Sequence, residues 1–513
     1  MYRSELNQIE FEDFYLPFGG KLSGKNRWIK LAGFVPWDEI ERCYRRSLSG
    51  SPLGAPAKAA RIAFGALIIK ERLGVTDEET VEQILENPYL QYFLGLSEYR
   101  DTPLFDPSTM VHFRCRFEQV DFTRINEAII ESALSQAGET LDPDSDPDDA
   151  GGEVTHQGKL VLDATCTPAD ITYPTDLKLL NEGREKLEKV IDKLHAPFVG
   201  KHKKPRSYRQ KARKAYLQTA KRKQVSAKKR RVAIGKQLRF IRRDLGHIDT
   251  LLERGSNLSL LTEYENRCLR VIHTLYDQQL EMYEQRTRRV DDRIVSISQP
   301  HVRPIVRGKA AAKTEFGAKL SVSHVHDGYV LLDTLSWDAY NESGELVEQV
   351  ETYKKRFGHY PASVHADQIY RTQDNRRYCK HTGIRLSGKP LGRPRKQIAE
   401  NKAELKALRE QTYQDELDRI PIEGKFGNTK RKGTLARIMA KLPHTSVSVI
   451  NIGLIVLNLD KCLRELLFWL QNLCSQSFAK LLALFNKRLK SPKSIPETWL
   501  THPLHQTKDA AAP

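Results

Sequence analysis

The chain has 513 residues, of which 39% are hydrophobic and 29% charged, as in a globular protein of two or three domains. Its 83 Lys and Arg outnumber its 65 Asp and Glu and give a net charge of +18, which indicates a polyanionic partner. The seven cysteines form no CxxC pair and no zinc-type spacing with histidine, which argues against a disulfide framework or a structural zinc site and favours the cytoplasm.

No membrane partner is expected from the apolar segments. The first residues, MYRSELNQIE, lack the apolar core of a signal peptide. The most apolar stretch, 447–459, is too short to span a bilayer, and Asn451 and Asn458 interrupt it. We interpret it as part of a buried helix.

Residues 1–136 predict an all-α N-terminal domain. Thr76 and Glu79 have the spacing of a capping box that opens one helix, and Pro88 closes it. A later helix start, at 106–108, leads to Arg114 and Arg116. If that helix exposes both arginines, the region forms a helix-turn-helix DNA reader. An ordinary helical bundle is an equally good interpretation.

A second domain is expected after an acidic linker rich in Asp, Gly and Pro at residues 137–158. A short apolar strand, 159–165, is followed by helical periodicity from residue 176. Within that block, residues 201–243 contain 19 Lys or Arg and no Asp or Glu. We therefore predict a basic helical insertion over about 176–300.

Strand patterns resume beyond the insertion, and then helices follow. Alternation at 316–322 and 329–335 predicts a hairpin, a helix is expected at 345–357, and another short strand ends at Asp367. A charged helix from Gln397 to about Met439, with a possible kink at Pro421, precedes an apolar helix over 447–485. The expected fold class is α/β, with a catalytic domain over 159–457 and a C-terminal helical region and tail over 458–513.

Two of the predicted strands carry a carboxylate where apolar residues are otherwise expected, namely Asp163 and Asp367. A buried carboxylate without a partner costs several kcal/mol, and a metal ion removes that cost. For either aspartate alone, a turn or cap role is the better interpretation, but two such strands together weaken it. On the charged helix, Arg419 lies four residues before Glu423 and Lys430 seven after it, so all three project to one side. A solvated helix with an ion pair is the alternative there.

These motifs resemble the insertion-sequence transposases of the DDE class, in the broad group related to the insertion sequence 4 and 5 families. The family signature is Tyr, two residues, Arg, three residues, Glu, six residues, Lys. Arg419, Glu423 and Lys430 match it, whereas the Tyr position holds Glu416 and Tyr413 lies three residues early. Segments such as LVLDATCTPADITYPTD, RPIVRGK, HADQIYRT and EGKFGNTKRKG are also similar to the family.

The resemblance implies an RNase H-like fold, with the two aspartates on adjacent strands and the glutamate on a nearby helix. It implies that Asp163, Asp367 and Glu423 are catalytic and bind two Mg²⁺ or Mn²⁺ ions, an arrangement that suits hard oxygen ligands. The expected reaction is cleavage at transposon ends and strand transfer into target DNA. The expected partners are the double-stranded terminal repeats, the target DNA and further copies of the chain, as a homodimer or larger oligomer.

Two other functions remain open from the residues alone. A metal-dependent endonuclease that does not join strands would share the same carboxylates. A non-catalytic regulator derived from a transposase would still bind DNA, but the chain keeps all three carboxylates.

DNA contacts are expected from several cations. Arg419 and Lys430 are suited to phosphates beside the site, and the basic block offers Lys228, Lys229, Arg230 and Arg231. The Gly-Arg-Pro run at 392–396 resembles a minor-groove hook, although a plain loop is the better interpretation. His324 and His365 lie beside the proposed site and are expected to be hydrogen-bonded structural residues rather than ligands.

Overall fold

The computed structural model describes residues 9–16, 19–48, 56–138, 156–306, 314–325, 328–389, 392 and 401–489. Two compact units divide the chain, Met1–Lys461 and Cys462–Pro513. Most of the predicted acidic linker and residues 393–396 of the Gly-Arg-Pro run lie outside the described residues. The account below concerns the first unit unless it says otherwise.

The N-terminal region is helical, as the sequence predicts. Thr76 caps its fourth helix, because the Thr76 hydroxyl accepts the backbone N–H of Glu79 at 3.2 Å. Gly74, with φ of 68°, ends the preceding helix in the left-handed conformation that glycine adopts without strain. The bounds are η1 (Phe11–Asp13), α1 (Arg27–Ala32), α2 (Trp37–Arg46), α3 (Ala60–Leu73), α4 (Asp77–Glu86), α5 (Pro88–Phe93), α6 (Thr109–Cys115) and α7 (Gln119–Gly138).

A mixed six-stranded sheet follows, so the described chain is α/β with a helical N-terminal region. Its order is β2-β3-β1-β5-β6, and β4 also pairs with β3. β1 is antiparallel to β3 and parallel to β5, and β5 is parallel to β6. The bounds are β1 (Lys159–Pro168), β2 (Arg303–Val306), β3 (Thr314–Val325), β4 (Tyr329–Ser336), β5 (Ser363–His365) and β6 (Arg385–Leu386).

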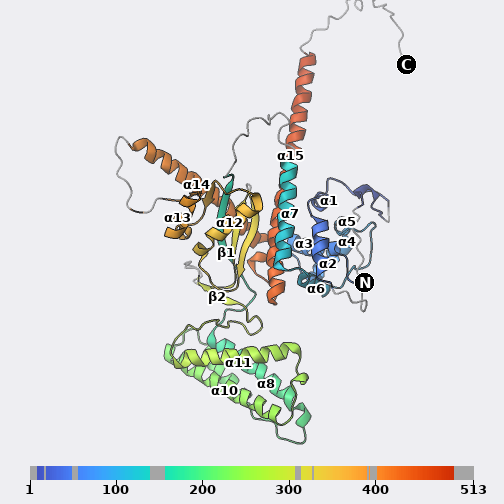
Figure 1. Ribbon diagram of the computed structural model, residues 1–513. Helices are drawn as coiled ribbons and strands as arrows, with labels where there is room; N and C mark the ends of the chain where they lie inside the picture. Colours follow the sequence, from blue (N-terminus) through green and yellow to red (C-terminus); the bar gives the residue numbers. More distant parts are fainter. Residues whose placement is uncertain are drawn as a thin grey trace, which may run out of the picture. The chain divides into compact units, whose positions relative to one another are not determined.

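The predicted helical insertion lies between β1 and β2. Its leucines and isoleucines recur at helical spacing and meet in one apolar core, which includes Leu187 and Ile191 of one helix and Ile241 and Leu245 of another. Figure 1 shows α8, α10 and α11 side by side, and their packing contacts agree. The bounds are α8 (Asp176–His195), η3 (Ala196–Phe198), α9 (Arg209–Ala220), α10 (Ala227–Glu253), η4 (Leu258–Leu260) and α11 (Glu263–Glu284).

The later helices cover both faces of the sheet. On one face, Ile422 and Phe426 of α14 pack with Val161 of β1 and Val322 of β3. On the other face, Gln349 of α12 donates to Ser321 Oγ of β3 at 3.0 Å. The bounds are η5 (Glu342–Gly344), α12 (Leu346–Phe357), η6 (Gln368–Tyr370), α13 (Gln373–His381), α14 (Lys402–Lys432) and η7 (Thr434–Ala436). α14 is shorter than predicted, because Gly433 is extended and ends it.

The apolar helix α15 (Pro443–Leu489) is longer than the sequence predicts. Its part at Pro443–Trp469 has the length and mean hydropathy, 1.5, of a membrane span, which corrects the expectation that it is too short. However, 78% of its most apolar window is buried in the protein. Asn458 Oδ1 accepts the backbone N–H of Val330 at 2.9 Å, and Asn451 donates to Gln119 at 2.7 Å. Such contacts are those of a core helix, so α15 does not indicate a membrane protein.

Candidate active site

Asp163 lies in the middle of β1, on the face of the sheet that α14 covers. Its Cα partner on β3 is Val322, and its Oδ1 accepts the backbone N–H of Ala164 at 2.8 Å. Burial raises the pKa of Asp163 to about 6; Glu423 adds to the rise, while the Ala164 N–H and Arg419 oppose it. The charged carboxylate is therefore poorly compensated by the protein, and a bound cation would stabilise it.

Asp367 follows β5, the strand next to β1. The parallel register pairs Val161 with His365, and Asp163 and Asp367 each lie two residues further along. The two aspartates therefore project from neighbouring segments on the same face. Asp367 caps η6 by accepting the backbone N–H of Gln368 at 2.7 Å, and 60% of its side chain is exposed.

Arg419 of α14 links the carboxylates. Its Nη1 lies 3.8 Å from Asp367 Oδ1, and its Nη2 lies 3.9 Å from Glu423 Oε1, one helical turn away. Arg419 also acts electrostatically on Asp163. The three carboxylates come from a strand, a loop after the next strand and a helix; Arg419 pairs with two of them, and its charge lowers the pKa of the third, Asp163.

Lys430 of α14 contacts β1. Its Nζ donates to Thr165 Oγ1 at 2.8 Å and to the Cys166 carbonyl at 2.7 Å. Both acceptors belong to β1, within three residues of Asp163. These hydrogen bonds of Lys430 therefore connect α14, which carries Glu423, to the strand that carries Asp163.

The donor set of Asp163, Asp367 and Glu423 fits hard divalent cations. All three offer carboxylate oxygens, the ligands that Mg²⁺ prefers. Arg419 supplies the positive charge among them in this structure. Among the described residues, three ligand atoms within 4.8 Å of one another occur at His365, Asp415 and Asp418 instead. The trio is thus assembled but more open than a closed ligand cage.

The sequence did not single out Asp415 or Asp418, and His365 was expected to be structural. Asp415 and Asp418 are three residues apart, a spacing that places both on one face of the predicted helix. That spacing was the available signal. His324, the other histidine beside the site, lies 2.8 Å from Lys425 Nζ, and burial lowers its pKa to about 3. It is therefore a neutral, hydrogen-bonded residue.

The prediction that α6 exposes Arg114 is wrong. Arg114 is 7% exposed, and its guanidinium pairs with Asp77 at the start of α4. A charge this deeply buried needs a carboxylate partner, and Asp77, which is distant only along the sequence, provides it. Arg116 is partly exposed and donates to the Ser47 carbonyl at 2.9 Å. α6 consequently offers DNA less charge than the sequence suggests.

The basic block forms α9 and the first half of α10. Lys228, Lys229 and Arg230 are exposed, whereas Arg231 is partly buried with its guanidinium 4.1 Å from the Tyr283 ring centre. The block is not wholly unneutralised, because Asp192 of α8 pairs with Lys204 at 2.5 Å and also with Arg209. Its exposed cations are spread along the whole block, from residue 201 through α9 to residue 243 of α10.

Two separate segments of the chain match known protein families. Residues 17–116 match a transposase domain (DUF772), and residues 364–460 match a transposase DDE domain. The second match includes Asp367 and Glu423 but begins after Asp163. No solved structure matches the chain.

One curated relative is an uncharacterized protein, ORF8 in the nfe locus of Rhizobium meliloti. It is 32% identical over 151 residues, which are 29% of this chain and 66% of the relative. The chain therefore covers slightly less than two thirds of that protein, whose name states no activity. The segments 17–116 and 364–460 are thus both similar to transposase domains.

Proposed function

We propose that the chain is a DDE transposase that cleaves DNA at the ends of an insertion sequence and joins those ends to target DNA. Asp163, Asp367 and Glu423 are its catalytic carboxylates. The observation that carries the proposal is that Arg419 pairs with Asp367 and Glu423 and acts on the charge of Asp163, the most buried of the three, which is left poorly compensated.

The strand arrangement supports an RNase H-like catalytic domain. Three antiparallel strands, β4, β3 and β1, are followed in the sheet by β5 and β6, both in parallel pairing. Asp163 lies on the central strand and Asp367 follows its parallel neighbour, as the family resemblance implies. The helical insertion enters after β1 and leaves this order unbroken.

Asp163, Asp367 and Glu423 would hold two Mg²⁺ or Mn²⁺ ions. When bound, such ions activate the attacking oxygen and neutralise charge on the leaving oxygen. The chain must supply ionised carboxylates for this. Because the pKa of Asp163 is raised to about 6, the ligand set is fully charged only above that pH.

Arg419 and Lys430 have different roles in this proposal. A planar guanidinium binds phosphate through parallel N–H donors, so we assign Arg419 to the phosphate beside the scissile bond. Lys430 is a positioning residue, since its contacts with Thr165 and Cys166 fix Glu423 relative to Asp163. The exposed Lys228, Lys229 and Arg230 bind the DNA backbone away from the reaction.

The proposal is tested with a plasmid that carries the gene and its flanking DNA. The full-length protein should cleave at the element ends with Mg²⁺ or Mn²⁺, and Asp367→Asn and Glu423→Gln should abolish cleavage while DNA binding persists. Asp374→Asn is the control, because the Asp374 side chain is 88% exposed on α13. Cleavage by Asp367→Asn or Glu423→Gln at more than a few per cent of the control would contradict the proposal.

A further inference from the structure

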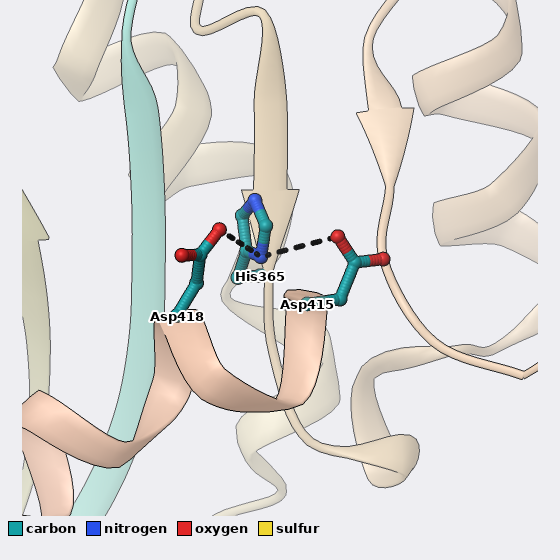
Figure 2. Close-up of side chains that lie close together, drawn as sticks. All are labelled: His365, Asp415 and Asp418. Carbon is teal, nitrogen blue, oxygen red and sulfur yellow. Dashed lines mark ion pairs between the residues drawn. The ribbon is translucent and has the colours of Figure 1, made fainter. Parts of the chain in front are cut away.

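A second cluster of ligand atoms lies on the same helix as Glu423. His365 is the last residue of β5, and Asp415 and Asp418 lie three residues apart on α14. His365 Nδ1 is 3.8 Å from Asp415 Oδ1 and 3.9 Å from Asp418 Oδ2. Figure 2 shows the imidazole facing both carboxylates, one on each side of its Nδ1.

The imidazole is buried and one of its nitrogens is unsatisfied. His365 is 0% exposed, and its Nδ1 has no hydrogen-bond partner among the described residues. Separations of 3.8 and 3.9 Å are too long for hydrogen bonds to the carboxylates. A buried polar atom that points between two oxygen ligands calls for a group that bridges all three.

The other ring nitrogen fixes the orientation. His365 Nε2 lies 2.9 Å from Ser363 Oγ, on the same strand. Histidines that bind metals usually donate the second ring N–H to such a partner, which turns the remaining lone pair toward the ion. Arg385 Nη2, which can only donate, also lies 3.5 Å from Nε2. An ion on Nδ1 therefore requires Nε2–H to donate to Ser363 Oγ and Arg385 to move away from the ring.

Two cations now pair with the two aspartates, and a bound ion would displace them. Asp415 Oδ2 accepts from Arg385 at 2.9 Å, and Asp418 Oδ2 pairs with Lys159 at 2.8 Å. The Arg385 and Lys159 side chains are 42% and 55% exposed. Asp415 itself is 4% exposed and its Oδ1 also accepts from Gln411 at 3.2 Å, so a bound ion would have to replace the charge that Arg385 supplies.

We propose that His365, Asp415 and Asp418 bind one divalent ion of the zinc class, at a site separate from Asp163, Asp367 and Glu423. One imidazole nitrogen and two carboxylate oxygens suit Zn²⁺ and Co²⁺ better than Mg²⁺. Tetrahedral bonds of about 2.0–2.2 Å place the ligand atoms about 3.3–3.6 Å apart. His365 Nδ1 would therefore approach each carboxylate by a few tenths of an ångström, and the two carboxylate oxygens, which lie within 4.8 Å, would approach each other by up to about 1.5 Å. A fourth position remains for water.

The ion would connect β5 to α14 beside the proposed active site. Asp367 follows His365 by two residues, and Arg419 follows Asp418 directly. Binding at this site would therefore fix the relative position of Asp367 and the helix that carries Arg419 and Glu423. The inference does not rest on the proposed transposase activity, because it concerns a different set of ligands.

The test uses full-length protein in which Asp163→Asn, Asp367→Asn and Glu423→Gln silence the first site. Cys115→Ser is added, because the exposed Cys115 thiol lies 3.0 Å from His444 and could capture zinc. Zn²⁺ is titrated by calorimetry and Co²⁺ by visible absorption, without DNA. One equivalent should bind, excess Mg²⁺ should not displace it, and Zn²⁺ should raise the melting temperature.

Graded variants in that background decide the assignment. His365→Gln and Asp418→Asn should each weaken Zn²⁺ binding by at least about 100-fold, and Ser363→Ala by about 10-fold. Asp374→Asn should have no effect. Circular dichroism identifies any variant that fails to fold. If His365→Gln fails to fold, the Zn²⁺ affinity of Asp418→Asn alone decides whether the site exists. Absence of a one-equivalent site, or a Zn²⁺ affinity in His365→Gln and Asp418→Asn that equals that of the background protein, would show a plain ion-pair network and overturn the proposal.

Discussion

The sheet and the helical insertion each contain an aspartate whose pKa is raised by burial, Asp163 and Asp244, and only the first belongs to the proposed active site. Burial raises the pKa of Asp163 to about 6 and that of Asp244, in α10, to about 7. The ionised form of each carboxylate therefore destabilises the folded protein. Asp244 is 0% exposed, and neither of its oxygens has a hydrogen-bond partner among the described residues.

The neighbours of these aspartates differ. The charge of Glu423 raises the pKa of Asp163, and Asp367 follows the strand next to β1; both of those carboxylates are largely exposed. Asp244 lies near Glu188, Arg184 and Arg243, within a helical core. A raised pKa thus does not identify a catalytic carboxylate by itself. Further oxygen ligands that substrate can reach are what distinguish Asp163.

The largest expected difference between the two aspartates is in DNA cleavage. Asp163→Asn should slow Mg²⁺-dependent cleavage by at least about 10³-fold, equivalent to about 4 kcal/mol of transition-state stabilisation, because it removes a ligand charge. Asp244→Asn should leave the rate within about 2-fold of the unsubstituted protein. Rates are measured on DNA from the element ends under single-turnover conditions. Equal losses in both variants would mean that Asp163 acts through folding alone.

A smaller effect is expected from the cations of α14. Lys430→Ala should slow cleavage by about 10²-fold and raise the Mn²⁺ concentration required, since Glu423 loses its link to β1. Arg419→Ala should slow cleavage similarly but lower the Mn²⁺ requirement, because a competing cation is removed. Lys406→Ala, at an exposed position of the same helix, is the control. Identical Mn²⁺ titrations for all three variants would contradict the distinction.

The insertion should affect DNA affinity rather than chemistry. Replacing Lys228, Lys229 and Arg230 by alanine should reduce the slope of log affinity against log salt by roughly one for each phosphate that the protein no longer neutralises. Lys354 and Lys355, exposed on α12, provide a matched double substitution. The slope is obtained from binding isotherms at several salt concentrations, and an unchanged slope would remove α10 from the DNA interface.

Much of this arrangement was predictable, because it depends on local pattern. Asp163 and Asp367 were found as carboxylates in short apolar strands, and Glu423 by its spacing from Arg419 and Lys430. Arg114 was misplaced because its partner Asp77 lies on another helix. The cluster at His365 needed the pairing of β5 with β1 and the rotation of α14. Asp244 was missed because a charged residue in a basic helix looks solvated until the core around it is known.

The smallest expected effect is on stability, where the two aspartates should behave alike. The folded pKa of each exceeds the ordinary value of 3.8, so folding favours the protonated form and ionisation destabilises the protein. This cost is absent below pH 3.8 and complete above about pH 6 for Asp163 and about pH 7 for Asp244. Asp163→Asn and Asp244→Asn should therefore each stabilise the metal-free protein by about 1–3 kcal/mol at pH 8 and by nearly nothing at about pH 3.5. Urea unfolding with a chelator present measures both, and lower stability of Asp163→Asn at pH 8 would contradict the burial argument.

Strand joining tests the central claim most directly. A pre-cleaved element end with a free 3′-hydroxyl is incubated with a target plasmid, Mn²⁺ and the full-length protein, and covalently joined products are counted. We expect joined products with the unsubstituted protein, none with Glu423→Gln, and normal yields with Asp244→Asn. Cleavage of intact ends without any joining would identify an endonuclease, and joining by Glu423→Gln would show that the reaction takes place elsewhere in the chain.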